Sequence, residues 1–291
     1  MRLCPRCGKP SGAYPPPSSC QFCGYVLETI EGHLAFAPEL AHQSEGFEAS
    51  YFDRLSRLEP GNFWFEARNQ LLIWALQRYF PAASCFLEIG CGTGFVLAGI
   101  AKALPHLGLS GSEVFTAGLS IAARRTPRAE LFQMDARQIP FVDHFDVIGA
   151  FDVLEHIRED DQVLAQMRQA LRIPGGGIMI TVPQHPFLWS KSDEYAHHVR
   201  RYRIGELEAK VERAGFKVVR ATSFVSLLLP LMLAARLKQR RSGRFDPSAE
   251  FEISALANKV LSSVMSFERT ILKAGLSFPA GGSLLLLAKS V

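Results

Sequence analysis

The residue types and spacing most suggestive of chemistry lie in a glycine-rich stretch, Glu88–Gly94, that follows an apolar run. Gly90, Gly92 and Gly94 alternate there with other residues, so a turn between a strand and a helix can bring backbone amides close to a ligand. A dinucleotide-binding turn has the spacing G-x-G-x-x-G, but Phe95 takes the place of its third glycine. The lysine and hydroxyl residue of a P-loop are also missing. The turn therefore favours a nucleotide-like ligand with no phosphate to cradle.

Carboxylates stand at the ends of the first two strands that the sequence predicts around this turn. Glu88 comes two residues before Gly90, where a carboxylate suits a cationic group such as the amino group of a methionyl moiety. Glu113 ends the second strand, and an acid at that place in an open α/β sheet can accept both hydroxyls of a ribose. The two acids therefore predict a ligand with an amino acid end and a sugar.

Further along the chain, more segments of the same kind follow in order. They are Met134-Asp135-Ala136, Phe145–Ile148 and Phe151–His156. With the glycine turn and Glu113, they resemble the motifs of class I S-adenosylmethionine-dependent methyltransferases. The resemblance covers residues 46–223 and the final strand.

This resemblance implies a fold, a cofactor and a set of contacts. The fold is α/β, a Rossmann-like seven-stranded mostly parallel sheet with helices on both faces. The cofactor is S-adenosylmethionine, and the glycine turn with Glu88 and Glu113 would hold its methionyl and ribose parts. The Asp135 side chain would meet the adenine amino group, and the Ala136 amide would meet a ring nitrogen. The implied activity is methyl transfer.

A second cluster of functional groups opens the chain, before any of these motifs. Two CxxC pairs are separated by a twelve-residue loop, and a glycine follows each second cysteine. Four thiolates at this spacing suit a tetrahedral zinc ion, and a segment this short would take most of its folding energy from the metal. A pair of disulfides is the alternative, although the cytosolic location expected below disfavours it. The predicted zinc ribbon spans residues 1–30 and has the ligands Cys4, Cys7, Cys20 and Cys23.

Three histidines are candidates for a general base, which an oxygen or nitrogen acceptor can require. His156 follows the fourth strand and resembles the "EH" position of small-molecule O-methyltransferases of the ubiquinone pathway. His185 follows the fifth strand, and His198 belongs to the segment 193–202. That segment resembles the "H-x-R-R-Y" element of many bacterial members. The alternatives are a packing or helix-capping histidine, and a loop whose arginine is anchored to a carboxylate.

An aromatic segment, Gly61–Asn69, precedes the first strand. It resembles the "FWF-x-x-R-N" element of a bacterial subgroup, and we expect a helix that covers the cofactor, with Arg68 near the cofactor carboxylate. For Trp64 and Phe65 the simpler interpretation is packing of that helix on the sheet. Residues 31–81 would then be a linker with N-terminal lid helices.

The elements that must position these residues alternate regularly after residue 84. Apolar runs separated by helical patterns predict a mostly parallel sheet with helices on both faces. Residues 28–45 have no clear period, whereas 46–80 are helical with a break at Pro60-Gly61. The predicted strands are Cys85–Ile89, Leu107–Gly111, Leu131–Gln133, Phe145–Ala150, Gly177–Val182, Lys217–Thr222 and Ser283–Ala288.

An apolar insertion interrupts the methyltransferase pattern of residues 82–291 at about 224–280. Residues 224–237 read FVSLLLPLMLAARL, a run of ~20 Å as a helix and too short for ~30 Å of bilayer hydrocarbon. Five basic residues between 236 and 244 suit anionic head groups, so peripheral membrane contact through 224–244 is one interpretation. A second helical stretch, 253–272, has an apolar face. There are two other interpretations of the insertion. It can form a roof over a pocket for a hydrophobic acceptor, or it can pack on the sheet or form a dimer face.

Bulk composition sets the remaining limits. The chain has 291 residues, is 48% hydrophobic and has a net charge of +4, which is too weakly basic to indicate a nucleic-acid partner by itself. The first residues have no apolar leader pattern, and we expect a cytoplasmic protein, in part peripheral on the inner face of the membrane. The acceptor would be small or lipid-like.

Two other functions compete with this expectation. One is an rRNA or tRNA methyltransferase whose ribbon binds RNA, but the ribbon offers only Arg2, Arg6 and Lys9 as basic residues. The other is a non-catalytic zinc-ribbon interaction protein with a relic cofactor fold. The intact acids Glu88, Glu113 and Asp135 argue against that second alternative.

Overall fold

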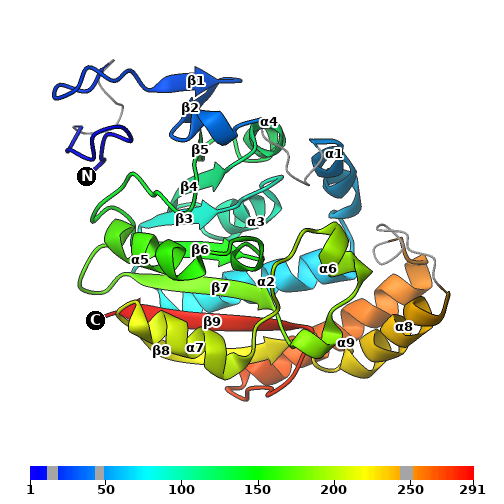
Figure 1. Cartoon of the computed structure of the whole chain (residues 1–291). Coiled ribbons are helices and arrows are strands. Elements are labelled where there is room, and N and C mark those ends of the chain that lie inside the picture. Colours follow the sequence, from blue (N-terminus) through cyan, green and yellow to red (C-terminus); the bar gives the residue numbers. More distant parts are fainter. Residues whose placement is uncertain (12–18, 43–48, 243–251) are drawn as a thin grey trace.

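A nine-stranded mixed sheet dominates the computed structural model, which describes residues 1–11, 19–42, 49–242 and 252–291. The strand order is β1-β2-β5-β4-β3-β6-β7-β9-β8, with β9 antiparallel to both of its neighbours. Figure 1 shows the N-terminal strands at one edge of this sheet and β8 at the other. The seven predicted strands are all present. They are β3 Cys85–Ile89, β4 Gly108–Glu113, β5 Glu130–Gln133, β6 Val147–Phe151, β7 Gly177–Pro183, β8 Phe216–Phe224 and β9 Ser283–Ser290.

Each face of the sheet is covered by its own helices and hydrophobic core. Side chains alternate between the two faces along a strand, so Leu87 and Ile89 join one core while Phe86 joins the other. The first core includes residues of α5 Asp160–Ala170 and α7 Ile204–Arg213. The second includes residues of α2 Phe63–Tyr79, α3 Phe95–Ala103, α4 Thr116–Arg125 and α9 Ala255–Lys273. This is the Rossmann-like α/β fold that the sequence predicts.

Two short strands that the sequence analysis missed extend the sheet. β1 Glu28–Ile30 and β2 His33–Ala35 form a hairpin whose two-residue turn, Glu31-Gly32, has positive φ at both positions. β2 pairs in parallel with β5. The buried Gln133 side chain fixes the next segment, since its amide bonds the backbone N–H and C=O of Ala37 at 3.0 and 2.7 Å. A polar residue thus ties the N-terminal region to the sheet.

The cysteine cluster lies beside this edge. Its two turns have matching backbone geometry, because Gly8 N–H bonds Cys4 C=O and Gly24 N–H bonds Cys20 C=O. Both glycines have φ near +70° (69° and 70°), a conformation that other residues adopt at a cost. The backbone of Leu3 donates to Pro140 C=O at 2.9 Å, so the N-terminal segment attaches to the loop after β5. The Pro-rich loop between the two cysteine pairs, residues 14–17, lies outside the described residues.

The insertion begins later than its apolar run suggests. The apolar run 224–237 does not form a single helix, because Phe224 ends β8 and α8 spans Leu229–Ser242. The intervening turn is held by the buried Glu268 of α9, whose carboxylate accepts the N–H groups of Val225, Ser226 and Leu227 at 2.6 to 2.8 Å. Within the part of the chain that the structure describes, no helix combines the length and apolar character needed to cross a bilayer.

Candidate functional site

The site is a cavity of about 2070 Å³ at the edge where the parallel strands end. The carboxyl ends of β3, β4, β5 and β6 all contribute to it, which is where open α/β sheets bind their ligands. Residues of α1 Ala49–Leu58, α2, α6 Lys191–Tyr195 and α8 also line it. A single ligand pocket usually has ~300–1,000 Å³, so this cavity has room for a cofactor and a second molecule.

The glycine turn forms part of the cavity wall through Gly90 and Gly92. Gly94 precedes α3 with φ +74°, and a Cβ there would lie 2.8 Å from the Cβ of Ala122. A Cβ on Gly90 would lie 2.5 Å from a methyl group of Val153. Side chains at these positions would collide with neighbouring elements, so the glycines allow α4 and the loop after β6 to pack closely around the turn.

The three predicted acids, Glu88, Glu113 and Asp135, all line this cavity, and their carboxylates have different partners. Glu88 is 3% exposed and its Oε2 has no hydrogen-bond partner among the described residues. Burial raises the pKa of Glu88 to about 8, although the charge of nearby Arg68 opposes the shift. Glu113 accepts the N–H groups of Gly92 at 3.0 Å and Val114 at 2.8 Å. Asp135 is paired with Arg137, whose Nε lies 2.9 Å from Oδ2.

Arg68 lies in the same cavity, on α2. Its guanidinium pairs with Asp152 and stacks 4.6 Å from the ring centroid of Trp64. The buried Nε of Arg68 has no hydrogen-bond partner in the described part of the chain. An unpaired donor on Arg68 and an unpaired acceptor on Glu88 therefore line one cavity, and an amino acid's carboxylate and ammonium would satisfy both.

Helix α1 closes over the glycine turn, by contacts that the sequence analysis did not find. Phe52 lies against Gly92 and Gly118, where added Cβ atoms would be 3.7 and 2.9 Å from its ring. The carboxylate of Glu59, 3% exposed, accepts the Thr93 hydroxyl at 2.6 Å and pairs with Arg125. A glutamate at the end of an amphipathic helix gives no signal in the sequence that its partners lie in two later elements.

Two of the three predicted histidines lie together at the cavity, and the third does not. His156 and His198 line the cavity, with ring centroids 4.7 Å apart and the ring planes nearly perpendicular. Enclosure by protein, together with neighbouring His198, lowers the pKa of His156, so its ring is neutral at neutral pH. His185 is not among the described residues that line the cavity, and it stacks on Phe187 at 4.9 Å. His185 is therefore the least suitably placed of the three candidate bases.

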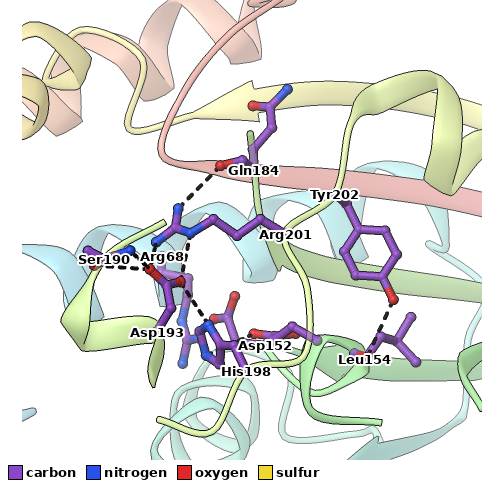
Figure 2. Close-up of polar contacts among 10 residues, drawn as sticks. Arg68, Asp152, Leu154, Gln184, Ser190, Asp193, His198, Arg201 and Tyr202 are labelled. Atoms are coloured by element: carbon purple, nitrogen blue, oxygen red, sulfur yellow. Dashed lines mark hydrogen bonds and ion pairs between the residues drawn. The ribbon is translucent and has the colours of Figure 1, made fainter. Parts of the chain in front are cut away.

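The segment 198–202 combines anchoring residues, whose contacts Figure 2 shows, with His198, which lines the cavity. Arg201 binds Asp193 through two hydrogen bonds of 2.6 and 3.0 Å, and it also donates to the Gln184 carbonyl. Tyr202 is fully buried and donates to Leu154 C=O and Asp160. His198 is fixed by a 2.9 Å bond between its Nδ1 and Asp193. Both sequence interpretations of this segment thus apply, each to different residues.

The cysteine cluster has the geometry of a metal site. The Sγ atoms of Cys4 and Cys23 are 3.7 Å apart, and those of Cys7 and Cys20 are 3.8 Å apart. A tetrahedron with Zn–S bonds of 2.3 Å has sulfur–sulfur edges of ~3.8 Å. All four cysteines are free thiols, and their sulfur atoms lie within 4.8 Å of one another. They form the ligand set of a structural zinc site rather than two disulfides.

Comparison with known proteins gives the same family. The family described as "Methyltransferase domain" matches residues 51–221, which is more than half of the chain. Phosphoethanolamine N-methyltransferase 2 of Haemonchus contortus, solved with S-adenosylmethionine, has a TM-score of 0.58 at 19% identity, over 85% of this chain and 58% of that one. A complex of the Trm112 methyltransferase activator with a methyltransferase of Haloferax volcanii has a TM-score of 0.53 at 16% identity, over 83% and 93%.

A curated relative matches by sequence. Polyketide synthase ThaQ of Burkholderia thailandensis is 28% identical over 173 residues, which cover 54% of this chain. The chain spans only 8% of the length of that synthase. The family match, the fold and a cavity whose unpaired groups suit a methionyl moiety agree. The chain belongs to the methyltransferase-domain family.

Proposed function

We propose that this methyltransferase acts on a small or lipid-like acceptor that reaches the cavity at a membrane surface. The observation that carries the proposal is that one cavity is lined both by the glycine turn and by apolar residues of α8. Leu231 and Met232 of α8 contribute to the wall, as does Leu228 just before this helix. An acceptor that enters past these side chains passes apolar surface before it meets the cofactor pocket, which favours a lipophilic molecule.

The insertion also has exposed apolar side chains, which favour contact with a membrane over contact with water. On α9, Leu256, Val260 and Phe267 lie on one face and are 74%, 54% and 62% exposed. On α8, Leu231 and Leu237 are more than half exposed. Large apolar side chains gathered in this way mark a surface that another apolar phase covers.

Charge favours the same partner. The chain continues beyond Leu237 with Lys238, Arg240 and Arg241, and then Arg244, with no acid before Asp246. The side chains of these basic residues lie outside the described part of the structure. Each would add about 1 kcal/mol of attraction to an anionic membrane surface. An apolar helix followed by basic residues is typical of an interfacial anchor.

The cofactor would be held by the groups already assembled. Glu88 would receive the ammonium and Arg68 the carboxylate, while Glu113 would accept the ribose hydroxyls. Asp135 would meet the adenine amino group, and the Ala136 amide a ring nitrogen. S-adenosylmethionine supplies a methyl group already activated on a sulfonium, so the chief task of the chain is to orient the acceptor and exclude water. His156 and His198 would face that acceptor.

The phosphoethanolamine N-methyltransferase among the similar structures acts on a small molecule, which supports a small acceptor or head group here. The test is flotation with vesicles of anionic or of neutral lipid, followed by incubation with tritiated S-adenosylmethionine. We expect flotation with anionic vesicles only, with weaker binding at high salt, and label in the lipid fraction of a total extract. Label in RNA instead would support the alternative acceptor class and overturn the proposal.

A matched pair of variants makes this test specific. The triple variant L256S/V260S/F267S removes the exposed face of α9 and is expected to lose flotation while still binding S-adenosylhomocysteine. V26S changes a comparably exposed side chain (58%) within the predicted zinc ribbon, far along the chain from α9, and is expected to float normally. Equal flotation of the triple variant and the wild type would exclude this face as the membrane contact.

A further inference from the structure

The loop after β6 contains a buried carboxylate that the cofactor contacts leave unexplained. Glu155, on the short helix Leu154–His156, is 0% exposed, and neither of its carboxylate oxygens has a hydrogen-bond partner among the described residues. A buried charge is normally paired or bound to a metal, and even a protonated carboxyl would leave its O–H without an acceptor here. The structure around Glu155 is therefore missing a partner.

Other deeply buried carboxylates of the chain show how unusual this is. Glu268 accepts three backbone N–H groups, and Glu59 accepts the Thr93 hydroxyl and pairs with Arg125. Asp160 accepts the Tyr202 hydroxyl at 2.6 Å and the Lys210 ammonium at 2.9 Å. The fold satisfies these three acids with its own donors, whereas at Glu155 the described residues provide none within hydrogen-bond distance. Glu88 also has an unpaired oxygen, but it lies where the cofactor ammonium is proposed to bind.

Two imidazole nitrogens complete a set of ligands around Glu155. The ligand atoms of Glu155, His156 and His198 lie within 4.8 Å of one another, and the Nε2 of His198 is 4.0 Å from Oε1 of Glu155. Ligand atoms around a first-row cation are about 3 Å apart at bond lengths of ~2.1 Å. The three groups are therefore spaced slightly wider than bound ligands, and a cation would have to draw them together.

Hydrogen bonds at the far side of each ring leave the inner nitrogens free to bind a metal. The Nδ1 of His198 lies 2.9 Å from Asp193, which two bonds from Arg201 keep ionised, so this nitrogen must carry the proton (Figure 2). In the neutral ring, Nε2 then has a lone pair. A ring nitrogen of His156 likewise donates to the backbone carbonyl of Ala196. Metal-binding histidines are typically oriented by such bonds to a carboxylate or a carbonyl.

We propose that Glu155, His156 and His198 bind a divalent first-row transition-metal ion at the wall of the cofactor cavity. Two imidazoles and one carboxylate suit Mn²⁺, Fe²⁺ or Zn²⁺ better than Mg²⁺ or Ca²⁺, which prefer oxygen ligands. Three protein ligands leave coordination positions open toward the cavity. The cation would hold and polarise an oxygen atom of the acceptor. This role rests on the proposed function, whereas the existence of the site does not.

The test is a titration of the zinc-loaded protein with Mn²⁺ alone, followed by electron paramagnetic resonance. Mn²⁺ is chosen because thiolates of the cysteine cluster prefer zinc, so the two sites do not compete. We expect one Mn²⁺ per chain in the wild type, and binding at least about tenfold weaker in E155Q and in H198A. His197→Asn changes the adjacent exposed histidine to a residue that tolerates its positive φ, and should bind Mn²⁺ like the wild type.

Calorimetry with S-adenosylhomocysteine on the same samples keeps the two proposals separate. E155Q is expected to retain that binding, because glutamine has the same shape as the buried glutamate. No Mn²⁺ bound by the wild type up to about 1 mM, or equal affinity in wild type, E155Q and H198A, would overturn the metal site. Failure of S-adenosylhomocysteine to bind would count against the proposed cofactor contacts instead, and the Mn²⁺ result would still decide this proposal.

Discussion

Arg68 and Glu88 come from different elements, α2 and β3, yet they present opposite unpaired groups to one cavity. Arg68 leaves its Nε without a partner and Glu88 leaves its Oε2, both among buried atoms. The charge of Arg68 also lowers the pKa of Glu88, although burial is the larger influence and raises it. The two groups suit a zwitterionic amino acid, because its carboxylate can accept a hydrogen bond from Arg68 and its ammonium can donate one to Glu88.

The protonation of Glu88 should therefore change when the cofactor binds. With a pKa of about 8 in the free protein, Glu88 is mostly protonated at pH 7, and an ammonium beside it would stabilise the ionised form. Binding then releases a proton, so affinity should rise with pH from about 5.5 to 7, below the range in which the ligand's own amine titrates. Calorimetry with S-adenosylhomocysteine in buffers of different ionisation enthalpy measures the proton count.

E88Q serves as the matched variant for that measurement. It keeps a carbonyl acceptor but cannot lose a proton, so its binding enthalpy should no longer depend on the buffer through this site. Its affinity should fall about tenfold or more, because a buried charge-assisted bond is lost. A wild-type enthalpy that is the same in all buffers would show that Glu88 does not ionise on binding.

A side chain at Gly94 should damage both the fold and cofactor binding. The alanine Cβ would lie 2.8 Å from Ala122 Cβ and 2.9 Å from Ala122 Cα, in a backbone conformation with φ +74°. The strain alone should cost about 1–2 kcal/mol of unfolding free energy, and the clash with backbone adds to it. Denaturant unfolding of G94A compared with G205A checks this. Gly205 has open space around its Cβ position, so G205A should be near neutral.

Removal of zinc should loosen the N-terminal edge while leaving the cofactor cavity in place. The cysteine turns have few buried side chains of their own, so metal ligation supplies most of their stability. C20S should lose about one equivalent of zinc per chain and become sensitive to proteolysis before β1. C85S changes a cysteine outside the cluster and should keep its zinc. Metal content by mass spectrometry and limited proteolysis test this, and full zinc in C20S would contradict it.

Sequence patterns predict the central fold because its signals are local. Glu88, Glu113 and Asp135 stand at or next to the carboxyl ends of the short strands β3, β4 and β5, and the turn at Gly90 needs a backbone that glycine adopts readily. Parallel strands carry their carboxyl ends to one edge, so acids at strand ends are expected to meet there. The cavity and its unpaired groups on Glu88 and Arg68 agree with that expectation.

Other parts depend on partners far along the chain and carry no local signal. β2 has three residues, and besides its hairpin partner β1 it pairs with β5, about a hundred residues later in the chain. Gln133 is also bonded to Ala37 across 96 positions. In the sequence, Glu59 has the pattern of a solvent-exposed residue at a helix end. In the structure it binds Thr93 and Arg125. Glu155 reads in the sequence as one half of an "EH" pair, and only burial reveals that its carboxylate has no partner.

Asp193 should prove the most sensitive acid outside the cofactor contacts. It is 1% exposed and accepts bonds from Arg201, His198 and the Ser190 cap, so D193N leaves a buried guanidinium without its counter-charge. We expect a loss of about 3–5 kcal/mol in unfolding free energy. Asp161 also has basic partners but is 61% exposed, so D161N should cost less than about 1 kcal/mol. Denaturant unfolding of both variants at pH 7 measures the difference.

The pH dependence of stability gives this last prediction a second readout. Burial alone would raise the pKa of Asp193, but hydrogen bonds from His198 and Arg201 outweigh it and hold the pKa below its usual range. A depressed carboxyl pKa contributes stability that is present above the unfolded-state value of about 3.9 and is lost as pH falls through the folded-state value. Wild-type stability should therefore fall more steeply below pH 4 than that of D193N. Parallel acid-unfolding curves for the two proteins would rule out this role for Asp193.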